Sequence, residues 1–294
     1  MERIEFANGL EMSRLVYGLW RLDQDDCSTG HIRAKLQACL DQGITTMDTA
    51  DIYGGYRTEE IFGSALRGSG LRDRMEIVTK CDIVAPMGRY ADRPVKHYDT
   101  SRAHILSSVD MSLKLMGLDH IDLLLIHRPD PFMDADETGS ALDEVVASGK
   151  VRAVGVSNFR PWDMDLLQGS MRQPLVTNQI EFSLTHNGAL TDGDMAYLQR
   201  KRIPPMAWSP LGGGSLLTGT HAAKEALDRV AKRLGSTPDA VAIAWILAHP
   251  ARVLPVMGTN NMNRIKALSD AAKVKIDRET WFDLYTAALG HDVA

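Results

Sequence analysis

The chain has 294 residues, a net charge of −5 and a pI near 6.0. This acidic balance argues against a nucleic-acid surface, which usually carries a basic stripe. No run of roughly 18 apolar residues is present, so no membrane span is expected, and the polar N-terminus lacks the apolar core of a signal peptide. Three widely spaced cysteines, Cys27, Cys39 and Cys81, match neither a disulfide framework nor a zinc site. We therefore expect a cytoplasmic protein without a bound metal.

Secondary structure is predicted from the spacing of apolar residues along the chain. Residues 3–12 alternate polar and apolar side chains around Asn8-Gly9, a strong signal for a β-hairpin. After it, apolar strand-like runs alternate with amphipathic helical stretches. Strands are predicted at residues 15–18, 45–48, 76–80, 121–127, 153–156, 175–179, 205–208 and 253–256. Helices are predicted at residues 31–42, 58–67, 102–116, 141–148, 189–202, 239–247 and 264–272.

Eight strands that alternate with helices can close into a (β/α)8 TIM barrel. Continuously apolar strands fit a parallel sheet covered on both faces. The alternative, an open doubly wound sheet, would want a Gly-x-Gly-x-x-Gly turn after the first strand, and the sequence contains none. We expect a single α/β barrel domain over residues 1–294. Its N-terminal hairpin would plug the bottom, and extra C-terminal helices would lie at residues 221–233 and 278–288.

Ionisable side chains lie at the ends of consecutive predicted strands. Asp48 ends the second strand, Lys80 the third and His127 the fourth, and Tyr53 follows Asp48 by five residues. In a TIM barrel this rim carries the chemistry. A phenol is a poor acid near neutral pH unless its phenolate is stabilised. The Lys80 ammonium would do that, Asp48 would keep the amine protonated, and His127 could orient a substrate oxygen. The cluster therefore predicts a proton-donating site.

Each of these residues also has a purely structural interpretation. Tyr53 could be a packed loop aromatic, Lys80 a solvated strand end, and His127 a structural histidine. Asp48 could cap a turn, and Asp51 competes with it for the role beside the lysine. Their joint placement on strands two, three and four favours the functional interpretation.

Six segments carry a family resemblance: residues 48–54 (DTADIYG), 78–80 (VTK), 124–129 (LLIHRP), 155–159 (GVSNF), 177–179 (TNQ) and 208–214 (WSPLGGG). In these motifs, and in their order nearly from end to end, the chain resembles the aldo/keto reductase family. Residues 18–22, 127–131 and 287–293 are similar to the YdhF-type oxidoreductases of that family. The resemblance implies that Tyr53 is the acid, that Lys80 and Asp48 tune it, and that His127 positions a carbonyl. It also implies a nicotinamide cofactor, since no side chain can deliver a hydride.

The ends of strands five to seven carry side chains suited to the nicotinamide. Hydroxyl and amide groups can hold a carboxamide through paired donors and acceptors. By resemblance, Ser157, Asn158 and Gln179 fix the nicotinamide amide and Trp208 stacks on its ring, although Trp208 taken alone would be a core residue. The resemblance extends the cofactor site to further residues: Trp20, Ser209, Leu211, Gly212, Gly213, Gly214, Gly258 and Thr259. The three consecutive glycines taken alone would indicate only a flexible turn.

A helix predicted to begin near Asn261 would present free N–H groups to a phosphate. Arg264 could clamp the adenosine 2′-phosphate, which favours NADP(H) over NAD. Two observations keep alternatives open. Gly258 stands where many family members have a lysine, so NAD use is also considered, and Arg264 could be a solvated residue of the first helical turn.

We expect an NADP(H)-dependent oxidoreductase that reduces an aldehyde or ketone and acts as a monomer on a small-molecule carbonyl substrate. A cofactor-binding regulatory subunit with little turnover is the alternative. A metal-dependent barrel hydrolase would need clustered ligands such as His-x-His, and the nine histidines form no such pair. Three roles stay open: Arg21 at the mouth, residues 86–99 as a lid or pocket wall, and Arg128, which could bind an acidic substrate or pair with Asp82 or Asp130.

Overall fold

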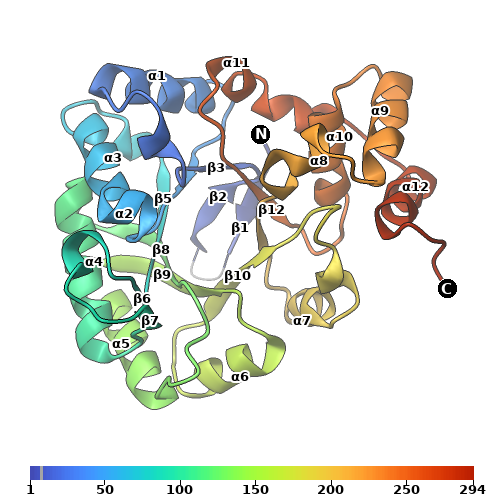
Figure 1. Ribbon diagram of the computed structural model, residues 1–294. Coiled ribbons are helices and arrows are strands. Elements are labelled where there is room, and N and C mark those ends of the chain that lie inside the picture. The colour runs from blue at the N-terminus through green and yellow to red at the C-terminus, as the bar shows by residue number, and fades with distance from the viewer. Residues whose placement is uncertain (7–8) are drawn as a thin grey trace.

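The computed structural model describes residues 1–6 and 9–294. Eight parallel strands close into a barrel in the order β3-β4-β5-β8-β9-β10-β11-β12, with β12 pairing back to β3. The strands are β3 (Val16–Gly18), β4 (Thr46–Asp48), β5 (Glu76–Cys81), β8 (Ile121–Ile126), β9 (Val151–Ser157), β10 (Leu175–Glu181), β11 (Met206–Trp208) and β12 (Leu254–Met257). The predicted (β/α)8 barrel is confirmed, and each predicted strand overlaps an observed one (Figure 1).

Helices surround the barrel because each buries its apolar face against the strands. They are α1 (Thr29–Leu40), α3 (Thr58–Leu66), α4 (Arg102–Met116), α5 (Ala135–Ala147), α6 (Pro161–Gly169), α7 (Asp194–Lys201) and α10 (Pro238–Leu247). Local signals set several of their ends. Ser101 caps α4 by accepting from His104 N, and Gly117 ends it at a φ of 68°. Asp134 caps α5, which therefore begins six residues before the predicted start.

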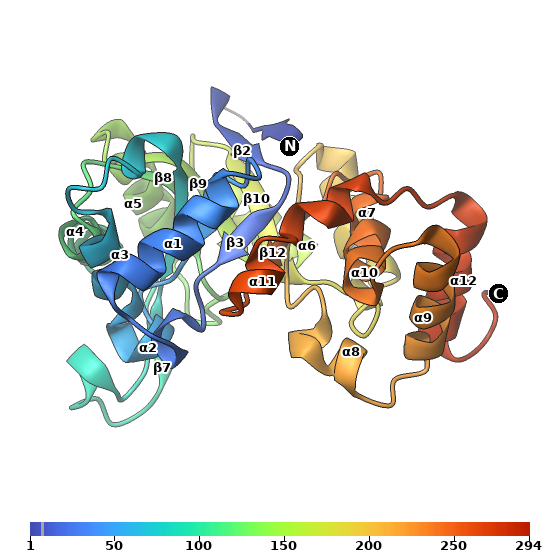
Figure 2. The same ribbon diagram turned by 90° about the horizontal axis from the view of Figure 1, so that it is seen from above.

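The N-terminal hairpin closes the bottom of the barrel, as predicted. Its strands β1 (Arg3–Glu5) and β2 (Glu11–Ser13) pair antiparallel. Ile4 and Met12 are fully buried and belong to one apolar cluster with Leu125 and Val176 of the barrel strands. The predicted turn residue Asn8 lies outside the described residues. The hairpin lies at one end of the barrel and the loops around α2 and α8 lie at the other (Figure 2).

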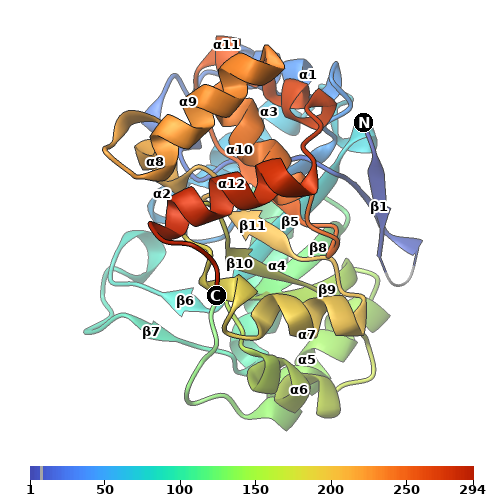
Figure 3. The same ribbon diagram turned by 90° about the vertical axis from the view of Figure 1, so that its right-hand side faces the viewer.

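Both predicted extra helices are present, as α9 (Ala223–Leu234) and α12 (Arg278–Leu289). They pack outside α10 and form the outer layer of the side seen in Figure 3. The contact between α10 and α12 is aromatic, because Trp245 stacks on Trp281 with 4.9 Å between ring centroids. This layer supports α10, one side of which faces the functional cavity.

Short elements occupy the loops at the upper end of the barrel. They are α2 (Tyr53–Tyr56), β6 (Ile83–Val84), β7 (His97–Tyr98), α8 (Ser215–Thr218) and α11 (Met262–Ile265), with 3-10 turns η2 (Leu22–Gln24), η4 (Gly88–Tyr90), η5 (Gly188–Leu190) and η6 (Gly212–Gly214). The turn η7 (Leu268–Lys273) follows α11 beside α10, and η3 (Arg72–Arg74) lies at the opposite end of the barrel, directly before β5. The helix predicted at residues 264–272 is wrong as one element, since it is divided between α11 and η7. The helix predicted at residues 189–202 is likewise divided between η5 and α7. None of the helices described is long and apolar enough to cross a membrane.

Candidate active site

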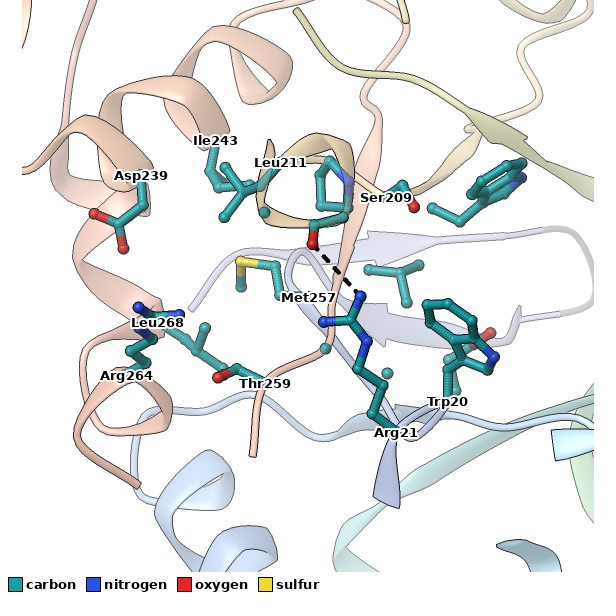
Figure 4. Close-up of a pocket in the computed structure, with 18 of the residues that line it drawn as sticks. Trp20, Arg21, Ser209, Leu211, Asp239, Ile243, Met257, Thr259, Arg264 and Leu268 are labelled. Carbon is teal, nitrogen blue, oxygen red and sulfur yellow. Dashed lines mark hydrogen bonds between the residues drawn. The ribbon is translucent and has the colours of Figure 1, made fainter. Parts of the chain in front are cut away.

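The upper ends of the barrel strands surround a cavity of about 670 Å³. In Figure 4 it runs from Asp239 and Arg264 on one side to Trp20 and Ser209 on the other. Most of the predicted site residues line it: Asp48, Tyr53, His127, Trp20, Ser157, Asn158, Gln179, Trp208, Ser209, Leu211, Gly213, Gly214, Gly258, Thr259 and Arg264. Lys80 is not among the lining residues, but its ammonium contacts two that are, Asp48 and Tyr53. Gly212 is the predicted cofactor residue that lies outside it.

Lys80 is fully buried and its ammonium is surrounded by oxygen atoms. Nζ donates to Asp48 Oδ1 at 2.7 Å and to the Thr49 carbonyl at 2.7 Å. It also lies 3.3 Å from the Tyr53 hydroxyl oxygen. Asp48 and Lys80 meet because β4 and β5 are neighbours in register, with Asp48 opposite Val78. The acid, amine and phenol predicted from separate segments are therefore in direct contact.

Tyr53 stands on a tight turn that only particular residues can form. The following residues Gly54, Gly55 and Tyr56 have φ values of 59°, 64° and 70°. Glycine adopts this left-handed region without steric cost, whereas tyrosine does so at some expense. The Tyr56 hydroxyl anchors the turn by donating to the Ile83 carbonyl and accepting from Ala85 N. The Tyr53 phenol is thus held by a fixed backbone rather than a free loop.

Burial and the neighbouring charges act in opposite directions on the pKa values of Tyr53 and Lys80. Burial raises the pKa of Tyr53, and the Lys80 ammonium counteracts part of that rise. Burial also acts to lower the pKa of Lys80, but the charge interactions and hydrogen bonds with Asp48 and Tyr53 together outweigh it and the net shift is upward. At neutral pH the phenol therefore holds its proton and the amine is an ammonium. A proton lost from the phenol would leave an anion 3.3 Å from a fixed positive charge.

His127 faces Tyr53 across the cavity, with ring centroids 6.0 Å apart and the rings at 72°. Burial, reinforced by the positive charges of Lys80 and Arg128, lowers the pKa of His127 well below its usual value. The imidazole is therefore neutral at neutral pH. A neutral imidazole can donate a hydrogen bond to an oxygen between the two rings without carrying a charge.

Asp51 does not take the place of Asp48 beside the lysine. Its Oδ2 accepts from Arg89 Nη2 at 3.0 Å, and Oδ1 has no hydrogen-bond partner among the described residues. Burial and the nearby Glu59 carboxylate raise the pKa of Asp51 to about 8. Arg89 comes from η4 in the 86–99 segment. This segment is therefore a brace for the Tyr53 turn, and none of its residues is among those that line the cavity.

Amide and hydroxyl side chains form a second hydrogen-bonded group on β9, β10 and β11. Gln179 Nε2 donates to Asp48 Oδ2 at 2.8 Å, and Ser157 Oγ donates to the Gln179 carbonyl at 2.9 Å. Asn158 Nδ2 donates to Ser157 Oγ at 2.8 Å, and Trp208 Nε1 donates to Asn158 Oδ1 at 2.9 Å. Asn158 has a φ of 61°, an uncommon conformation for a residue other than glycine. The four side chains predicted to act together are therefore in one network.

The loop after β11 approaches the cavity with little side-chain bulk. Gly213 and Gly214 have φ values of 66° and 104°, and both line the cavity. Gly212 instead packs against Thr185, whose hydroxyl would lie 2.5 Å from an added Cβ. Arg21 Nη2 lies 3.4 Å from the Gly213 carbonyl, the contact dashed in Figure 4. Arg21 therefore connects the loop after β3 to the loop after β11.

The far end of the cavity is formed by the segment after β12. The Tyr17 hydroxyl donates to the Thr259 carbonyl at 2.9 Å. Arg264 is exposed, and its guanidinium forms no ion pair with the residues that the structure describes. Sequence reasoning missed several lining residues from this end: Asp239, Ala240, Ile243, Asn260, Ala267, Leu268 and Ala271. Asn260 could have been inferred from its neighbour Thr259, but α10 residues carry no local signal of facing a cavity.

The contacts of Arg128 show which of its proposed ion pairs form. The backbone N–H of Arg128, rather than its side chain, donates to Asp82 Oδ2 at 2.8 Å, and Asp130 Oδ2 accepts from Thr100. The Arg128 guanidinium instead lies 5.8 Å from the Trp208 ring centroid and lines the cavity. Cys81, next to Lys80, is buried, and burial raises the pKa of its thiol well above the usual value, which disfavours the reactive thiolate.

Comparisons with known proteins agree with this geometry. The aldo/keto reductase family model matches residues 14–286. A 6-dehydroglucose reductase of Agrobacterium fabrum (strain C58) is 60% identical over the full length of both chains. Oxidoreductase YdhF of Escherichia coli K12 is 44% identical and covers 100% of this chain and 99% of its own.

A solved aldo/keto reductase from Klebsiella pneumoniae, in complex with NADP and acetate, superposes with a TM-score of 0.81 at 26% identity. It covers 96% of this chain and 93% of its own. The family resemblance and the oxidoreductase class expected from the motifs are therefore confirmed. The chain belongs to the aldo/keto reductase family.

Proposed function

We propose that the protein is an NADPH-dependent reductase that converts an aldehyde to an alcohol, with Tyr53 as the proton donor. The observation that carries this proposal is the Lys80 ammonium, which lies 2.7 Å from Asp48 and 3.3 Å from the Tyr53 hydroxyl at the base of the cavity. A phenol that holds its proton at neutral pH, yet has a cation ready for its anion, fits a general acid.

The residues present fit a nicotinamide dinucleotide. The amide network of Ser157, Asn158 and Gln179 offers donors and acceptors that match a carboxamide. At Gly213 and Gly214, the absence of side chains lets the backbone approach a pyrophosphate. At the far end, the guanidinium of Arg264, which forms no ion pair with any described residue, is suited to a phosphate. The Klebsiella pneumoniae relative, solved with NADP, supports the same choice of cofactor.

When bound, NADPH supplies the hydride that no side chain can provide. The chain's own residues do the rest. His127 and Tyr53 hold the carbonyl oxygen between them, and Tyr53 gives it a proton as the carbonyl carbon becomes an alcohol carbon. Lys80 stabilises the resulting phenolate, and Asp48 keeps that amine charged. Water then returns a proton to Tyr53, which leaves the alcohol and NADP⁺ as products.

For the substrate we propose 6-dehydroglucose, a sugar with an aldehyde at carbon 6. Two relatives, 60% and 35% identical to this chain, bear the name 6-dehydroglucose reductase. The lining of the cavity supports a polyhydroxylated ligand, since Arg128 and Trp20 both belong to it. A guanidinium donates to hydroxyl groups, and aromatic faces pack against the C–H surface of a sugar ring.

The test is turnover of 6-dehydroglucose with NADPH, followed by NADPH absorbance and by NMR of the product. One glucose should form for each NADPH consumed. NADPH binding without turnover of 6-dehydroglucose or of simple aldehydes would favour the alternative, a cofactor-binding regulatory subunit.

A further inference from the structure

Lys35 is a lysine on α1 whose side chain is 0% exposed, and no step proposed above uses it. Its Nζ donates to Asp25 Oδ2 at 2.6 Å and to Asn260 Oδ1 at 3.0 Å. Burying an ammonium is costly unless it is paired and hydrogen-bonded. Both partners lie outside α1: Asp25 belongs to the loop that precedes this helix, and Asn260 to the loop after β12, 225 residues away in sequence.

Asn260 completes the connection. Its Nδ2 donates to the Arg21 carbonyl at 2.6 Å, while its Oδ1 accepts from Lys35. Arg21 and Asn260 both line the cavity. The Lys35 ammonium therefore ties together two wall segments that are more than 200 residues apart, namely the loop after β3 and the loop after β12.

We propose that Lys35 is a positioning residue for the cofactor: it holds Asn260, and thereby residues 258–261, in the conformation that NADPH binds. This inference rests on the proposed function. The physical reason is preorganisation, because a wall fixed before binding need not be ordered when the ligand arrives. The effect should appear in cofactor affinity rather than in the chemical step, since Tyr53 lies in the other part of the cavity and Lys80 lies beneath it.

A direct electrostatic role, in which the buried charge attracts phosphate, is not favoured by the contacts. The ammonium is neutralised by Asp25 at 2.6 Å. The hydrogen bond from Lys35 lowers the pKa of Asp25, so this carboxylate is charged throughout the neutral range. His31 Nε2 lies 3.0 Å from the same oxygen and holds Asp25 from the solvent side. A neutral pair contributes through geometry more than through net charge.

The test compares Lys35→Met, Asn260→Ala and the double variant with the wild type. NADPH dissociation constants are measured by calorimetry, and kcat is measured with 6-dehydroglucose or a turned-over aldehyde at saturating NADPH. Lys35→Met should raise the NADPH dissociation constant about 10-fold, equivalent to about 1.4 kcal/mol, with kcat within about twofold. The double variant should bind no more weakly than Asn260→Ala, because Lys35 acts through that residue.

Arg14→Met is the matched control. Arg14 is also a buried cation bonded to another element, through the Leu247 carbonyl, but it does not line the cavity. The Arg14→Met substitution should lower Tm and leave NADPH affinity unchanged. Should Lys35→Met not fold, Asp25→Asn weakens the same hydrogen-bonded connection at its solvent-exposed residue. This variant should raise the NADPH dissociation constant by less than the factor expected for Lys35→Met.

Two results would overturn the inference alone: a Lys35→Met enzyme with lowered Tm but wild-type NADPH affinity, or fully additive effects of the two substitutions. Failure of the wild type to bind NADPH is a different outcome, and it would overturn the proposed function and this inference together.

Discussion

Gln179 and Asp48 share a hydrogen bond across the barrel mouth, in which Nε2 donates to Oδ2 over 2.8 Å. The bond joins the proton-donating group on β4 and β5 to the amide network on β9 and β10. It also fixes the orientation of the Gln179 amide, because its NH₂ group is turned toward the carboxylate. In the proposed complex, Oε1 is then the atom that accepts from the cofactor carboxamide.

Gln179→Leu keeps the size of the side chain but removes both ends of this link. We expect the NADPH dissociation constant to rise by about 10-fold, and kcat to fall because Asp48 loses a fixed donor. Calorimetry and steady-state rates measure the two effects. Thr177→Val, on the same strand but bonded to the Pro204 carbonyl away from the cavity, serves as the control. Equal cofactor affinity in both variants would refute the proposed role of Gln179.

Tyr53→Phe removes the proton but leaves the ring. The rate of carbonyl reduction should fall by ~10²–10⁴-fold, the usual contribution of a positioned acid. NADPH affinity should be nearly unchanged, as measured by calorimetry, because the hydroxyl contacts Lys80 and the substrate oxygen. An undiminished rate would show that the proton comes from another group.

Arg264→Ala tests the choice between NADP and NAD. Charge-assisted hydrogen bonds contribute about 1.5–3 kcal/mol, so NADPH affinity should fall by at least about 10-fold while NADH affinity changes little. Lys266→Ala is the control, since this exposed cation lies two residues further on and does not line the cavity. Equal losses for both cofactors would remove the argument for a 2′-phosphate clamp.

Arg128→Met tests the substrate side. We expect a rise in KM for 6-dehydroglucose of about 10-fold, from the lost hydrogen bonds of a charged donor. For benzaldehyde, which has no hydroxyl groups, kcat/KM should change far less. A parallel loss for both aldehydes would mean that Arg128 supports the catalytic group rather than the sugar.

Asp51 makes stability depend on pH. Its pKa is raised to about 8 in the folded protein, against about 4 in the unfolded chain. Between these values the folded state binds the extra proton, so this group's contribution to the free energy of unfolding falls as pH rises from 4 through 8. In the Asp51→Asn variant, the free energy of unfolding should therefore fall less steeply with pH than in the wild type, as measured by urea unfolding at pH 5, 6.5 and 8. Glu60→Gln, on the exposed face of α3, should not change that slope.

The sequence predicts the barrel and the proton-donating group because both depend on local patterns repeated in order. Asp48 ends β4 and Lys80 is the last residue but one of β5, and because these two strands are neighbours in the barrel, the two side chains meet. The choice of Asp48 over Asp51 could not be made from sequence. It depends on Arg89, which reaches Asp51 from a loop 38 residues away.

Other features were missed because tertiary contacts decide them. Asp239 and Ile243 line the cavity from α10, a helix that packs against α9 and α12 on its other side. The segment at residues 264–272 has helical character but is divided between α11 and η7. The assignment of Gly212 to the cofactor site was inferred together with its glycine neighbours; in the structure Gly212 packs against Thr185 and is not among the residues that line the cavity.

The hairpin at the bottom of the barrel has a kinetic consequence. Ile4 and Met12 of the described hairpin pack among the interior side chains of the barrel. The hairpin therefore closes the end of the barrel opposite the cavity. A ligand that reaches Tyr53 must enter and leave through the mouth at the opposite end. A dinucleotide extended from Gln179 to Arg264 would form the floor on which the second reactant rests. We therefore expect an ordered kinetic mechanism, in which the cofactor binds before the substrate and dissociates after the product.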